Sequence, residues 1–67
     1  MITIYINGEA ETLAPEFSVQ QLVEKIGLSD KRIAIECNAC ILPRSEYANH
    51  QLKDGDKLEI VHAIGGG

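Results

Sequence analysis

The alternation of apolar and polar residues at the start of the chain predicts a β-hairpin. Residues 2–6 place three isoleucines on one face and Thr3 and Tyr5 on the other, which is the period-two pattern of a half-buried strand. Asn7-Gly8 follows directly, and a type I′ turn needs positive φ at both central residues, which Asn and Gly tolerate. We therefore expect the return strand at residues 9–13.

The next segment shows helical periodicity. Four apolar residues recur at the spacing of one helix face: Val19, Leu22, Val23 and Ile26. Ser18 stands where an N-cap hydroxyl accepts a hydrogen bond from a free amide of the first turn, and Gly27 can end the helix in the left-handed conformation. Because Pro15 ends the preceding strand, this helix is expected to follow the first hairpin and to pack on a sheet.

The middle of the chain predicts a second hairpin. Residues 32–37 and 40–42 have the composition of two short strands, and Pro43 interrupts their pairing. The following residues, 44–51, are polar and are predicted to be irregular.

A final strand is predicted after a turn at residues 54–56, to which we assign no chemistry. One face of this strand carries Leu58, Ile60 and His62. The other face carries Glu59, Val61 and Ala63. The apolar residues on the second face indicate that the strand is covered on both sides, or nearly so.

The two cysteines, Cys37 and Cys40, enclose the turn-forming pair Asn38-Ala39. A structural zinc site needs four ligands, and a thioredoxin-like pair stands at the start of a helix that follows a strand. Because neither context is present, we favour two thiols facing each other across a hairpin. A redox or metal role for this pair stays open.

This order of elements predicts an α+β domain in which a mixed sheet of four or five strands curls over one helix. The final strand must return to the same sheet and is expected to lie centrally. The domain is assigned to residues 1–63, and residues 64–67 are expected to form a flexible glycine tail.

Composition and charge narrow the class of protein. Sixty-seven residues, 45% of them hydrophobic and 24% charged, are typical of one small ordered domain. The formal net charge of -4 argues against nucleic acid, because phosphate contacts need clustered Lys and Arg. The start of the chain shows neither a secretion signal nor a membrane span, so we expect a cytoplasmic protein. We also expect the free protein to be a monomer.

The whole chain resembles the ThiS family of sulfur carriers, which serve thiamin thiazole synthesis and have the ubiquitin-like β-grasp fold. The resemblance rests on the strand–Asn-Gly–strand opening, the Ser-capped helix, ILPR at 41–44, LKDGDKLEIV at 52–61 and the glycine terminus. It implies that a ThiF-like adenylating enzyme uses ATP to activate Gly67, which becomes a thiocarboxylate. A sulfur donor protein would supply the sulfur, and a ThiG-like thiazole synthase would receive it.

The chemistry of a terminal carboxylate explains the glycines. A C-terminal carboxyl group has an ordinary pKa of about 3.3 to 3.7, so at neutral pH it is an anion and a poor electrophile that must be activated. Residues 62–67 can span roughly 20 Å in extended form. Gly65 and Gly66 lack Cβ atoms and can thread closely past a partner's backbone.

The sequence predicts a protein co-substrate rather than an enzyme. It contains no phosphate-binding glycine loop and no plausible nucleophile with a base, so we assign no catalytic residue, no metal and no bound cofactor. His50 is expected on the surface of a polar loop, and His62 in the last strand. Candidate partner contacts are Tyr5, Leu42, Val61, His62 and Ile64, and the acidic balance suits basic patches on partners.

Three alternatives to this assignment stay open. A MoaD-like carrier for molybdopterin synthesis has similar features, although chain length and ILPR favour thiamin. A ubiquitin-like protein modifier or a plain interaction module with an inert tail would also fit. The chain departs from the family pattern in its cysteine-containing turn and in ending on three glycines rather than two, and we expect no trimming of the third.

Overall fold

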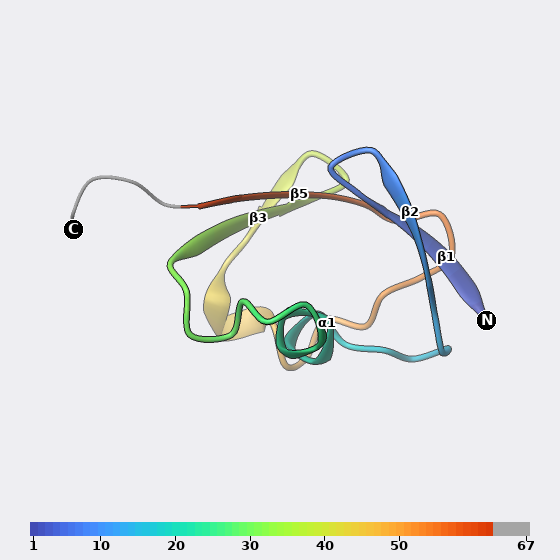
Figure 1. Cartoon of the computed structure of the whole chain (residues 1–67), viewed down its shortest axis with the longest axis horizontal. Coiled ribbons are helices and arrows are strands. Elements are labelled where there is room, and N and C mark those ends of the chain that lie inside the picture. Colours follow the sequence, from blue (N-terminus) through green and yellow to red (C-terminus); the bar gives the residue numbers. More distant parts are fainter. Residues whose placement is uncertain (63–67) are drawn as a thin grey trace.

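The computed structural model describes residues 1–62, within which one mixed sheet of five strands lies over one α-helix (Figure 1). In chain order the elements are β1 (Ile2–Ile6), β2 (Glu9–Leu13), α1 (Val19–Lys25), β3 (Ile33–Cys37), β4 (Cys40–Leu42), a 3₁₀ helix (Arg44–Glu46) and β5 (Lys57–His62). The strand order is β2-β1-β5-β3-β4. The predicted α+β β-grasp arrangement, with the last strand in the centre of the sheet, is confirmed.

The central strand β5 is paired on both sides. β1 runs parallel to it, with Tyr5 opposite Lys57 and Ile6 opposite Leu58. β3 runs antiparallel to it over the full length of β3. Since β1 and β3 belong to different hairpins, β5 joins the two halves of the chain into one sheet.

Asn7 extends the pairing between β1 and β5 beyond the end of β1. The chain turns away at Asn7 and Gly8, which have φ values of 51° and 87°, as the predicted type I′ turn requires. The Asn7 backbone N–H donates to the Leu58 carbonyl at 2.8 Å. Its side-chain Oδ1 accepts from the Ile60 N–H at 2.8 Å, and its Nδ2 donates to the Ile60 carbonyl at 3.0 Å. One side chain thus replaces the next residue of a neighbouring strand.

The helix begins and ends as predicted. The Gln21 N–H donates to Ser18 Oγ at 3.0 Å, and the Gln21 side chain accepts from the Ser18 N–H at 2.9 Å, which forms a reciprocal capping box. Gly27, just past the helix, has φ 78°. Among residues 1–62 no helix combines the length and apolar composition that crossing a membrane demands.

The hydrophobic core lies between α1 and the inner face of the sheet. Its buried side chains are Ile4, Leu13, Val19, Leu22, Val23, Ile33, Ile35, Cys37, Tyr47, Leu52, Leu58 and Ile60. Most of them come from the predicted strands and helix. Tyr47 and Leu52 come instead from the connection between β4 and β5.

The prediction that residues 44–51 are irregular is wrong in part. This connection contains the 3₁₀ helix, and the side chain of Tyr47 is only 2% exposed. The Val19 and Gln20 N–H groups donate to the carbonyls of His50 and Tyr47 at 2.9 and 3.0 Å. Amides of the first helical turn lack partners within the helix, and the connection satisfies two of them by crossing the start of α1.

The expectation that β5 is covered on both faces is also wrong. Val61 is 58% exposed, and Glu59 is exposed too, because α1 covers one face of the sheet and nothing in residues 1–62 covers the other. His62 keeps the phase of Leu58 and Ile60 but is exposed, since β5 runs past the helix at this end (Figure 1). Ala63, the predicted domain boundary and the tail at 64–67 lie outside the described residues.

Replacing Asn7 by Gly should lower the free energy of unfolding by about 2 kcal/mol, because two hydrogen bonds of about 1 kcal/mol each are lost. Glycine accepts the positive φ of this position, so backbone strain does not contribute. Asn7→Asp keeps the acceptor for the Ile60 N–H but turns a carboxylate oxygen, which cannot donate, toward the Ile60 carbonyl, so it should recover at most part of the loss. Urea denaturation measures both changes, and a Gly variant within about 0.5 kcal/mol of the wild type would contradict the bridging role.

Candidate functional site

The outer face of the sheet carries exposed apolar side chains. Tyr5 on β1 is 39% exposed, Val61 on β5 is 58% exposed and Ile41 on β4 is 77% exposed. Side chains alternate between the faces of a strand, and Ile4 and Ile60, next to Tyr5 and Val61, are buried in the core. Ile41 is opposite the exposed Glu36 and so lies on the same face as that residue. We call this surface the outer face; it consists of Tyr5, Ala34, Ile41 and Val61 together with the charged residues Glu36, Lys57 and Glu59. Tyr5 and Val61 were predicted as partner contacts, whereas Ile41 was missed.

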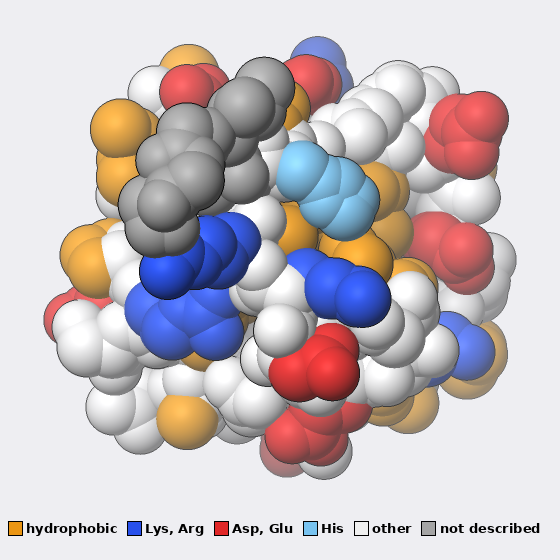
Figure 2. Space-filling model, turned by 60° about the vertical axis from the view of Figure 1, so that its left-hand side comes forward, with side chains coloured by type: hydrophobic (Ala, Val, Ile, Leu, Met, Phe, Trp, Pro, Cys, Tyr) orange, Lys and Arg blue, Asp and Glu red, His pale blue; other side chains and the backbone are white. Residues whose placement is uncertain are grey.

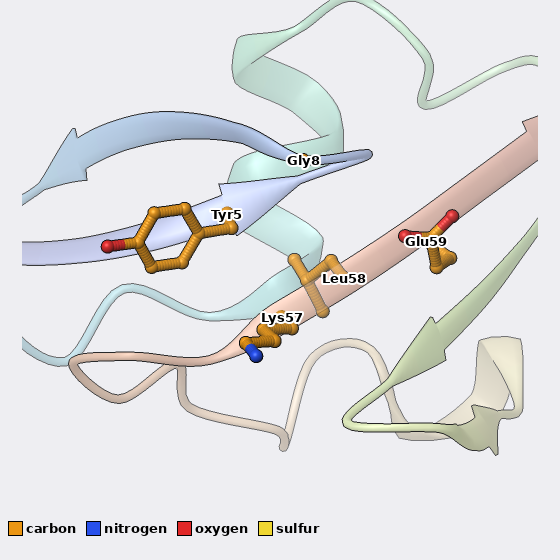
Figure 3. A pocket seen from close by; sticks show the side chains of 5 residues that line it. All are labelled: Tyr5, Gly8, Lys57, Leu58 and Glu59. Carbon is orange, nitrogen blue, oxygen red and sulfur yellow. The ribbon is translucent and has the colours of Figure 1, made fainter.

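Two hollows lie along β5 on this face. The first has a volume of about 320 Å³ and is lined by Tyr5, Gly8, Lys57, Leu58 and Glu59. Figure 3 shows the Tyr5 ring on β1 and the charged ends of Lys57 and Glu59 on the neighbouring β5. The second hollow, of about 220 Å³, is lined by Ala34, Ile35, Glu36, Ile41, Glu59 and Val61. Glu59 belongs to both, so the outer face is continuous across the central strand.

Two carboxylates face each other in the middle of the outer face. Glu36 on β3 is directly opposite Glu59 on β5, and both side chains are exposed. Like charges at directly opposed positions of an antiparallel pair destabilise a sheet. On the side away from β5, Glu36 is opposite Ile41 of β4. The outer face therefore combines apolar contact area with a negative centre, which suits a partner carrying Lys or Arg.

The far end of β5 has the opposite charge. β5 ends at His62, which is opposite Ile33, and Arg32 precedes Ile33 in the chain. The Arg44 guanidinium donates to the Lys31 carbonyl at 3.0 Å and stacks 5.8 Å above the Tyr47 ring. Figure 2 shows Lys and Arg side chains gathered at this end of the molecule, beside a histidine. The net charge of -4 gave no sign of this basic cluster.

The other predicted site residues have mixed placements. Leu42 is partly buried and packs against the core, while His62 is exposed where the described part of β5 finishes. Ile64, Gly65, Gly66 and Gly67 lie outside the described residues. Their predicted roles, as a partner contact, as the threading segment and as the sulfur-carrying residue, stay predictions.

The cysteine hairpin is confirmed. Cys37 and Cys40 are opposite each other, and Asn38 and Ala39 between them have φ values of 52° and 71°. Both thiols are free. Burial of Cys37, 7% exposed, raises the pKa of its thiol, and the negative charge of Asp56 and the neighbouring Cys40 raise it further. A buried thiol with a raised pKa is a poor nucleophile.

His50 is not the free surface residue that was expected. It is partly buried, and its Nε2 lies 3.6 Å from Sγ of Cys37. The connection that crosses the start of α1 brings the two residues together, although 13 positions separate them in the sequence.

A charge swap tests the Glu36–Glu59 repulsion. Glu59→Lys turns a like-charge pair into an opposite-charge pair, and the free energy of unfolding should rise by about 0.2–1 kcal/mol. Combining it with Glu36→Lys restores a like-charge pair and should remove the gain. Urea denaturation of the single and double variants measures these changes in the free energy of unfolding. If the double variant keeps the gain of the single one, repulsion between these side chains is not its cause.

The chain is similar to known proteins along almost its whole length. The ThiS family model matches residues 4–67. The sulfur carrier protein ThiS of Escherichia coli is 31% identical over 64 residues, which cover 96% of this chain and 97% of that protein. A crystal structure of a thiamine biosynthesis protein (ThiS) from Geobacter metallireducens superposes with a TM-score of 0.85 at 26% identity, covering 98% of this chain and 100% of that one.

A longer protein contains a similar segment. The thiazole synthase of Paramagnetospirillum magneticum is 42% identical over 64 residues, which are 96% of this chain, but this chain spans only 20% of the length of that protein. The family model and the full-length match to a sulfur carrier, together with the shared β-grasp fold, lead to one conclusion: the chain belongs to the ThiS family of sulfur carrier proteins.

Proposed function

We propose that this chain carries sulfur as a thiocarboxylate on Gly67 and delivers it for the thiazole of thiamin. The proposal is supported by the extent of the ThiS family match, which runs to residue 67. The matched segment therefore includes the three glycines. The proposal takes the Gly67 carboxyl group as the free terminus of the working protein.

The reaction needs an activating partner. An adenylating enzyme of the ThiF type joins the Gly67 carboxylate to the AMP part of ATP, and pyrophosphate leaves. The outer sulfur of a persulfide on a donor protein then attacks the acyl carbon of this mixed anhydride, and AMP leaves. A second thiol of the donor next attacks the donor's own sulfur in the resulting acyl disulfide, which releases the thiocarboxylate and leaves the donor as a disulfide. The net change replaces one carboxylate oxygen by sulfur, while this chain supplies only the acyl group.

The placement of β5 supports this role. Pairing with β3 runs to Ile33 opposite His62, so the residue that leads into the tail is fixed in the sheet. Pairing with the other hairpin ends earlier, because Asn7 makes the last contacts on that side at Ile60. Beyond Ile60 this edge of β5 is open within residues 1–62, and a partner can pair with it as an added strand.

The outer face is the proposed docking surface for the adenylating enzyme and for a thiazole synthase. Its apolar side chains provide contact area next to β5, and the Glu36–Glu59 pair gains a favourable partner when a cation docks on it. A segment similar to this chain lies within a protein named thiazole synthase. This supports a thiazole synthase of the ThiG type as the acceptor of the sulfur.

Incubation with the adenylating enzyme, ATP and a sulfur donor should increase the mass of the chain by about 16 Da, as one oxygen is exchanged for sulfur. Intact-protein mass spectrometry measures the change, and fragmentation should place it on Gly67. A chain lacking Gly67 is the control and should stay unmodified. A gain of about 32 Da on a cysteine would indicate a persulfide instead, and adducts on lysines of other proteins would indicate a modifier.

Val61→Asp should raise the KM of the adenylating enzyme for this chain by at least about tenfold with little change in kcat. The reason is that the lost docking contacts stabilise the bound substrate and the transition state equally. Val61 is 58% exposed, so the fold should tolerate the change. Ala48→Asp introduces the same charge in the exposed connection after the 3₁₀ helix and should leave KM unchanged. Equal effects of the two variants would contradict docking through the outer face.

A gene deletion separates the two carrier pathways. Loss of this chain should create a growth requirement for the thiazole of thiamin, which supplied thiazole satisfies. A requirement for molybdenum cofactor would assign the chain to molybdopterin synthesis instead.

A further inference from the structure

Three potential metal ligands meet at the end of β5 opposite to His62. They are Cys37 at the end of β3, His50 in the connection that crosses the start of α1, and Asp56 immediately before β5. Their ligand atoms all lie within 4.8 Å of one another. None of these residues has a part in the sulfur chemistry proposed above, so the cluster is a separate feature of the molecule.

The spacing of the sulfur and nitrogen atoms matches a tetrahedral zinc site. Zn–S bonds of about 2.3 Å and Zn–N bonds of about 2.0–2.1 Å at the tetrahedral angle separate the two ligand atoms by about 3.6 Å. Cys37 Sγ and His50 Nε2 are 3.6 Å apart. The Asp56 carboxylate would have to approach by at most about 1.5 Å, since Zn–O bonds are also about 2.0–2.2 Å.

Neighbouring groups already orient the carboxylate. Asp56 Oδ1 accepts from Asn38 Nδ2 at 3.1 Å, and Oδ2 accepts from the Lys53 N–H at 2.9 Å. The same Asn38 amide lies 3.8 Å from Cys37 Sγ, so one donor faces both the sulfur and the carboxylate. Outer hydrogen bonds of this kind fix metal ligands in place, and each carboxylate oxygen still has a free lone pair.

The backbone holds the other two ligands. Cys37 is fixed by pairing with Leu58 on one side and Cys40 on the other. The His50 carbonyl accepts from the Val19 N–H, and the His50 N–H donates to the Glu46 carbonyl at 2.9 Å. The three ligands therefore come from segments that the fold already places, rather than from free loops.

We propose that Cys37, His50 and Asp56 bind one Zn²⁺ ion, with water in the fourth position. A thiolate, an imidazole and a carboxylate form a donor set that suits Zn²⁺ better than Mg²⁺ or Ca²⁺, which prefer oxygen ligands alone. The Cys37 thiol gives its proton to the solvent when the Zn–S bond forms. The ion would tie the β3–β4 hairpin to the connection over α1 and to the start of β5.

Metal titration of the full-length chain, stripped of metal, tests the site. Zn²⁺ should bind at one equivalent by calorimetry, and Co²⁺ used in its place should give a thiolate-to-cobalt charge-transfer band. Zn²⁺ at a hundredfold excess over its Kd should raise Tm by about 10 °C or more, because a ligand that binds only the folded state stabilises it. The absence of one-equivalent binding and of any Tm rise would overturn the proposal.

Variants identify the ligands. Cys37→Ser, His50→Gln and Asp56→Asn should each weaken Zn²⁺ binding at least about tenfold, as losses even of outer partners do in known sites. Cys40→Ser and His62→Gln are the matched controls and should bind as the wild type does. If Cys40→Ser abolishes binding as fully as Cys37→Ser, the metal lies on the cysteine pair and the assignment is wrong. If Cys37→Ser does not fold, His50→Gln and Asp56→Asn still decide the outcome.

Discussion

The fold depends on how the last strand is held in the centre of the sheet. β5 pairs with one hairpin in parallel and with the other antiparallel, and an asparagine completes each ladder where its hairpin turns. Asn7 bonds both backbone groups of Ile60, and Asn38 accepts from the Lys57 N–H and donates its own N–H to the Lys57 carbonyl. Both asparagines have positive φ, so one residue type provides the turn and the bond to β5.

Helix α1 makes the two faces of the sheet unequal, because within residues 1–62 it covers only one of them. The inner face buries the core, while the outer face leaves Ile41 and Val61 exposed and places Glu36 opposite Glu59. Burial cannot account for the exposed apolar groups, and the opposed carboxylates act against stability. A partner that covers this face would explain both features, because the partner's apolar groups would exclude water and its cations would neutralise the Glu36–Glu59 pair.

Local sequence signals predicted most of the fold. Asn7-Gly8 fixed the first hairpin, and Ser18 and Gly27 fixed the ends of the helix, because each acts through neighbours in the chain. Local patterns could not predict where the polar connection crosses α1. The burial of Tyr47 and the contact of His50 with Cys37 both depend on this crossing. Val61 misled for a related reason, since an apolar residue has the same sequence signal in a core as on a docking surface. Of the candidate site, Tyr5 and Val61 were placed on the correct face from alternation alone.

The two ends of β5 have different chemical properties, and this difference separates the proposed roles. At one end His62 is opposite Ile33, which directly follows the basic residues Lys31 and Arg32 in the chain. At the other end Cys37 has a buried thiol with a raised pKa, held beside His50 and Asp56. Such a thiol is poorly suited to attack an acyl or persulfide group, and the sulfur chemistry proposed at the terminal carboxylate does not need it. A zinc ion at the Cys37 end would also keep this thiol from reacting with the carried sulfur, because a zinc-bound thiolate is held by the ion. The ion would not cover the outer face.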